Sequence, residues 1–110
     1  MATALAFKHI IVDGTGFTTI DDGRKVVAAA GTAEPLVAVS TLIKRVVIMA
    51  EVSNTGYIVV GGEDVIAADA TRTGIPLSAG ASFQLEIADL ASIYIDAEVN
   101  GDGCTFIYLT

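Results

Sequence analysis

The chain has 110 residues, of which 53% are hydrophobic and 6% aromatic, with no Trp and a formal net charge of −7. This length predicts one domain with a single core, and nucleic acid is excluded as a partner because only six basic residues are present and they are scattered. No apolar run approaches the roughly 18 residues of a membrane span, and no basic stretch precedes the first apolar residues, so we expect neither a membrane location nor a cleaved export signal, and synthesis in the cytoplasm fits.

Residues 1–24 mix apolar pairs with turns rich in Gly and Asp, and their periodicity is weak. We interpret this segment as an extended N-terminal arm, with an edge strand around residues 8–12. Terminal segments of this kind are often loose until a partner holds them. The regular pattern begins at Lys25, so the predicted domain covers residues 25–110.

From Lys25 onward, short apolar runs alternate with turn signals. Strands are predicted at residues 25–29, 34–39, 44–50, 57–60, 82–87, 92–99 and 104–109, with a short strand at 61–65 that leads into a long loop. Alternation is clearest in the run 82–87, where Phe83, Leu85 and Ile87 share one face and the polar residues share the other.

Two stretches rich in Gly and Asn separate consecutive strands. Residues 51–56 predict a hairpin or a tight corner, and residues 100–103 predict a hairpin. Seven or eight short strands without a capped helix predict an all-β fold, a single antiparallel β-sandwich of the jelly-roll type with the N-terminal arm ahead of it.

The chain offers few candidates for catalysis. A Ser or Cys nucleophile needs an adjacent base, and the only imidazole, His9, lies in the least regular segment. The single cysteine, Cys104, lies in an apolar run, so we expect a small core residue. One His is also too few for a cupin-type metal site. We therefore expect no enzyme activity and no cofactor.

Other sites for small ligands are equally weak. Oxygen ligands for a metal occur at Asp21 with Asp22, at Glu63 with Asp64 and at residues 100–102, but none has the spacing of a calcium loop, and turn formation explains them better.

The glycine pairs at Gly14 with Gly16 and at Gly61 with Gly62 are not followed by a helix that would bind phosphate. The adjacent basic residues Lys44 and Arg45 predict a solvated strand position or a sheet edge.

The high hydrophobic fraction has two explanations, which the sequence leaves open. Ala, Val, Ile and Leu supply most of it, as suits a thin, Ala-rich sandwich core. The same residues also suit a surface that is buried against another chain.

Residues 45–61 and 74–109 resemble a recurring type of small virion protein from tailed bacteriophages. The features that carry the resemblance are the apolar run 46–50, residues 54–56 ahead of 57–61, and the stretches 74–80, 85–90, 93–95 and 107–109, together with 30–33 ahead of 35–37. Such proteins are compact β-sandwiches that decorate a capsid or belong to tail and fibre assemblies. The resemblance implies a structural role without enzyme activity, and residues 1–24 lie outside it.

Our leading hypothesis is therefore a capsid decoration, or cement, protein on the exterior of the virion. Its partner would be the lattice of the major capsid protein, and decoration proteins commonly form trimers, so the resemblance implies a homotrimer. Tail, head-fibre or adaptor components are the alternative within the virion. A further alternative is a sugar-binding attachment module, with Tyr57, Tyr94 or Tyr108 as the stacking residue, although their strand positions favour packing in the core or between sheets.

Overall fold

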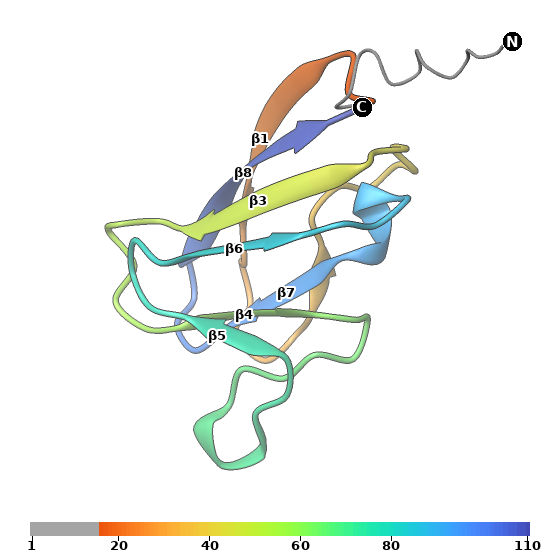
Figure 1. Cartoon of the computed structure of the whole chain (residues 1–110). Coiled ribbons are helices and arrows are strands. Elements are labelled where there is room, and N and C mark those ends of the chain that lie inside the picture. The colour runs from red at the N-terminus through yellow and green to blue at the C-terminus, as the bar shows by residue number, and fades with distance from the viewer. Residues whose placement is uncertain (1–15) are drawn as a thin grey trace, which may run out of the picture.

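The computed structural model describes residues 16–110, which form two four-stranded antiparallel sheets that face each other (Figure 1). The first sheet has the order β1 (Ile20–Val26), β8 (Gly103–Leu109), β3 (Arg45–Ala50) and β6 (Ser82–Leu85). The second has the order β2 (Glu34–Pro35), β7 (Tyr94–Ala97), β4 (Ile58–Gly61) and β5 (Ile75–Leu77). The helical turns η1 (Asp69–Thr71) and η2 (Leu90–Ser92) are of the 3₁₀ type.

The connections between strands identify the type of sandwich. Every connection except the one between β4 and β5 passes from one sheet to the other. With eight strands in two sheets, this is the connectivity of a jelly roll. The predicted fold class is confirmed. No helix in residues 16–110 is long and apolar enough to span a membrane.

The core lies between the two inner faces. Val46 and Ile48 of β3 and Ile58 of β4 are fully buried in it, and Phe106 of β8 is 5% exposed. Cys104 also belongs to this core, as predicted, and burial raises the pKa of its thiol to about 12. A thiol with so high a pKa stays protonated at neutral pH, so Cys104 is a packing residue.

Strand β1 crosses the boundary that the sequence places between arm and domain. It begins at Ile20 and pairs along its whole length with β8, so residues 20–24 belong to the first sheet, and the strand predicted at 25–29 ends at Val26. The sequence obscured it because Asp21, Asp22 and Gly23 read as a turn, although an exposed edge strand accepts polar residues. Residues 1–15, with the edge strand predicted around 8–12, lie outside the described residues.

The predicted hairpin at residues 100–103 is wrong. The turn is present, with Gly101 at a φ of 90°, but β7 pairs with β2 and β4 while β8 pairs with β1 and β3. The amide of Val27 donates to the carbonyl of Asp102 at 2.9 Å, which ties this turn to the end of β1. Turn residues predict that the chain reverses, but they carry no information on which sheet it enters next. Residues 51–56 form the tight corner that was the alternative to a hairpin, because β3 and β4 lie in different sheets.

The second sheet has short edge strands. Strand β2 covers only Glu34–Pro35 of the predicted residues 34–39, and β5 at the other edge contains Pro76. Proline has no amide hydrogen and is tolerated at sheet edges. The predicted strands at 44–50, 57–60, 82–87 and 104–109 are confirmed with small shifts at their ends.

The close packing of Phe106 on Gly23 leaves no room for a side chain at position 23. A Cβ atom at this position would lie 2.6 Å from Cζ of Phe106, so the ring would have to move. We expect Gly23→Ala to lower the free energy of unfolding by about 1–3 kcal/mol. Gly62→Ala is the matched control, since its Cβ would meet nothing within 4 Å. Urea denaturation measures both, and equal stabilities would contradict this packing.

Candidate functional site

A buried carboxylate on β7 holds two loops against the outer face of the second sheet. Asp96 is 1% exposed, and its Oδ1 accepts hydrogen bonds from the amides of Gly31 at 2.9 Å and Ala97 at 2.8 Å. Its Oδ2 accepts from the amide of Ala67 at 2.9 Å. Three backbone donors compensate the buried carboxylate, so its role is to anchor loops.

The loop of residues 62–74 covers apolar side chains on that outer face. Val65 and Ala67 of the loop are buried against Val59 of β4, and Tyr94 of β7 packs against the same small cluster. This cluster is separate from the core between the sheets. The second sheet is therefore packed on both faces.

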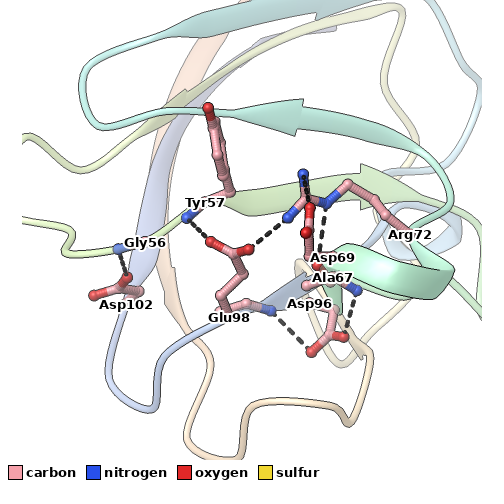
Figure 2. A network of polar contacts seen from close by, with 9 residues as sticks. Gly56, Tyr57, Ala67, Asp69, Arg72, Asp96, Glu98 and Asp102 are labelled. Carbon is pink, nitrogen blue, oxygen red and sulfur yellow. Dashed lines mark hydrogen bonds and ion pairs between the residues drawn. The ribbon is translucent and has the colours of Figure 1, made fainter.

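A polar network continues from this loop to the corner between β3 and β4 (Figure 2). Glu98 accepts from the amide of Tyr57 at 2.8 Å through Oε1 and from Nη2 of Arg72 at 2.5 Å through Oε2. The guanidinium of Arg72 also lies 4.9 Å from the ring centroid of Tyr57, within cation–π distance. Asp69 is a weaker partner of Arg72, at 3.8 Å and with its own side chain 93% exposed.

Asp102 fixes the same corner from the other side. Its carboxylate accepts from the amide of Gly56 at 2.8 Å and from that of Thr55 at 3.1 Å. The side chain of Asn54 exchanges two hydrogen bonds with the backbone of Gly103. These contacts hold the backbone around Tyr57 rigidly on the domain.

At the opposite end of the sandwich, Asp89 performs a similar task. The hydroxyl of Ser40 and the amides of Thr41 and Ala91 donate to it, and these hydrogen bonds hold the pKa of Asp89 below its usual value. Asp96, Asp102 and Asp89 therefore act as hydrogen-bond acceptors for backbone amides.

A hollow of about 210 Å³ lies beside Tyr57. Its walls come from three parts of the chain: Asn54, Thr55, Gly56 and Tyr57 at the corner, Ser78 and Ala79 between β5 and β6, and Glu98 after β7. Tyr57 itself is 42% exposed. An exposed aromatic ring beside fixed polar groups is an arrangement that binds small polar ligands.

The outer face of the first sheet is the second candidate surface. Val47 of β3 pairs with Ile107 of β8, and Met49 pairs with Thr105, so these side chains share that face. Met49 and Ile107 are 42% and 41% exposed. A hollow of about 380 Å³ lies among these residues and Asp22 of β1.

Charged pairs border this apolar face. Arg24 pairs with Glu51 at one end, and Arg45 pairs with Glu86 at 2.5 Å at the other. Lys44 and Arg45, which the sequence places at a solvated position, both have partners in the structure. Lys44 donates a hydrogen bond to the carbonyl of Gly16, and the guanidinium of Arg45 also lies over the ring of Phe17.

The residues considered for catalysis or metal binding do not come together. Within residues 16–110, no three His, Cys, Asp or Glu side chains are grouped so that they could share a metal ion. His9, Gly14 and the other residues before Gly16 lie outside the described residues. Gly61 and Gly62 line a shallow hollow together with Glu63 and Asp64, whose charges would repel phosphate.

The three tyrosines have different surroundings. Tyr108 packs against the core and its ring stacks on that of Phe106 at 6.2 Å, and Tyr94 packs under the 62–74 loop. For Tyr108 the expected packing in the core is confirmed. It is wrong for Tyr94, which packs on the outer face of the second sheet, and for Tyr57, which precedes β4, is 42% exposed and joins the network of Figure 2 through its amide.

The chain matches no family model, no curated protein and no solved structure. The resemblance to phage virion proteins therefore stays a prediction. What the molecule can do has to be inferred from its two surfaces.

Asp96, Glu98 and Arg72 are not among the residues that the sequence singles out as site candidates. Tyr94, Asp96 and Glu98 alternate with apolar residues, a signal that places them together on the outer face of a strand. The residues that meet them there, such as Ala67 and Arg72, come from a loop without periodicity. Local patterns could not have located that partner.

The anchoring role of Asp96 can be tested by its removal. Asp96→Ala leaves the amides of Gly31 and Ala67 without their acceptor, so we expect the free energy of unfolding to fall by about 2–4 kcal/mol. Asp69→Ala, the same change at an exposed carboxylate of the same network, is expected to cost less than about 0.5 kcal/mol. Chemical denaturation of both variants measures the difference, and a similar small loss in both would show that the loops do not need this anchor.

Proposed function

We propose that the protein is a structural component of a tailed-phage particle, a decoration protein that binds the outer surface of the head as a homotrimer and stabilises it. The observation that carries this proposal is the uncovered apolar face of the first sheet around Val47, Met49 and Ile107. Contiguous apolar surface of this kind marks a protein–protein contact.

The contrast between the two sheets supports the choice of this face. The chain covers the outer face of the second sheet with its own 62–74 loop, whereas Met49 and Ile107 on the outer face of the first sheet are 42% and 41% exposed. The resemblance to virion proteins supplies the partner, a capsid lattice. The net charge of −7 favours the exterior, because packaged DNA would repel an acidic domain.

The proposal predicts how the protein behaves with bare capsid shells. Mixed with shells, it should sediment with them and raise their resistance to heat. Met49→Glu should weaken this binding roughly ten-fold or more, because a carboxylate would be buried without a partner in the contact. Val52→Glu is the matched control, since Val52 is 80% exposed in the turn after β3 and does not line the hollow on this face.

Three results would refute the decoration role. The first is a protein that neither sediments with the shells nor protects them, and the second is a Met49→Glu variant that binds as tightly as Val52→Glu. The third is that labelled protein is found only at the tail of intact particles. This result would favour the alternative of a tail, head-fibre or adaptor component.

A truncation tests whether the N-terminal segment contributes to this contact. We expect deletion of residues 1–15 to weaken binding to shells and to leave the thermal unfolding temperature unchanged, because β1 begins only at Ile20. Deletion of residues 1–24 should unfold the domain, since it removes most of β1. Unchanged shell binding after the shorter deletion would exclude a role for the segment.

A further inference from the structure

The side chain of Tyr57 is held in place without being buried. The residue is 42% exposed, and its ring lies under the guanidinium of Arg72, 4.9 Å from the ring centroid. Figure 2 shows Arg72 on one side of Tyr57 and Gly56 on the other. Because Arg72 is itself fixed by Glu98 at 2.5 Å, the ring has a rigid support on that side. The 42% exposure of Tyr57 leaves part of its surface open to a ligand.

A hollow of about 210 Å³ lies beside Tyr57. Gly56, Tyr57, Ser78 and Ala79 are among its lining residues, and Arg72 is not. The volume is below the roughly 300–1,000 Å³ of pockets for drug-sized molecules. One six-membered ring with its substituents is the size of ligand that such a hollow admits.

The polar groups around the hollow can bind hydroxyl groups. The two oxygens of Glu98 each accept one hydrogen bond from the protein, at 2.8 Å and 2.5 Å, and each retains a second lone pair. Thr55 and Ser78 are among the lining residues of the hollow, and within residues 16–110 neither hydroxyl makes a hydrogen bond. The hollow therefore offers a fixed acceptor and two groups that both donate and accept.

We propose that this hollow binds one uncharged hexopyranose unit of a glycan. The apolar C–H face of the sugar would stack on the Tyr57 ring, and its hydroxyls would donate to Glu98 and exchange hydrogen bonds with Thr55 and Ser78. Acidic sugars are disfavoured because Glu98 lines the site and the chain carries a net charge of −7.

This inference goes beyond the proposed structural role and does not depend on it. The hollow lies at the corner between β3 and β4 and includes no residue of the apolar face around Met49. The protein could therefore contact a capsid through the first sheet and a cell-surface glycan through Tyr57 at the same time.

The test is a titration of the ¹⁵N-labelled full chain, followed by NMR, with glucose, galactose, mannose, N-acetylglucosamine and glucuronic acid. We expect at least one of the uncharged sugars to shift the amide signals of Gly56, Tyr57 and Ser78 in a saturable way, and glucuronic acid to leave them unchanged. Tyr57→Ala should weaken the binding roughly ten-fold. Tyr57→Phe should preserve it, because the ring remains.

Controls separate this proposal from loss of fold and from the capsid proposal. In Tyr57→Ala the amide that donates to Glu98 is kept, and an unchanged dispersion of the remaining signals shows that the domain is intact. Met49→Glu should bind sugar as the unmodified chain does. The proposal is overturned if none of the uncharged sugars shifts these signals, or if Tyr57→Ala binds as tightly as Tyr57→Phe. A protein that binds shells but no sugar would refute this inference alone.

Discussion

The structure depends on hydrogen-bond acceptors for the backbone amides of the loops in which the chain passes between the two sheets. In a jelly roll almost every connection crosses from one sheet to the other, so the amides of these loops have no strand partner. Asp96, Asp102 and Asp89 supply the missing acceptors, each with two or more backbone amides. Because a carboxylate offers several lone pairs in a small volume, one side chain can join two loops. Three of the thirteen acidic residues of the chain therefore have a structural explanation.

These carboxylate anchors also explain why the outer face of the second sheet is covered by a loop and that of the first sheet is not. By binding Ala67, Asp96 holds the 62–74 loop on the second sheet, where Val65 covers Val59. The same loop brings Arg72 to Tyr57 and Glu98, so the anchored loop also builds one wall of the rigid corner. The first sheet has no comparable cover in residues 16–110, and its apolar face stays open. One domain thus carries the apolar surface for which we propose a protein partner and the small polar hollow for which we propose a sugar.

Much of the fold could be predicted from the sequence, but the arrangement of its surfaces could not. Strands β3, β6 and β8 were located because alternating or continuous apolar runs report burial directly. Strand β1 was missed since its polar residues lie at an exposed edge, and the pairing across residues 100–103 was wrong because a turn does not specify a sheet. The hollow at Tyr57 unites three distant segments, and only the folded chain brings them together.

The two prolines of the chain limit how copies can associate. Pro35 lies in β2 and Pro76 in β5, and these are the two outer strands of the second sheet. Each removes a backbone donor from an edge where a neighbouring molecule could otherwise add a strand. Addition of a strand from a neighbouring molecule is thereby disfavoured at both edges of the second sheet.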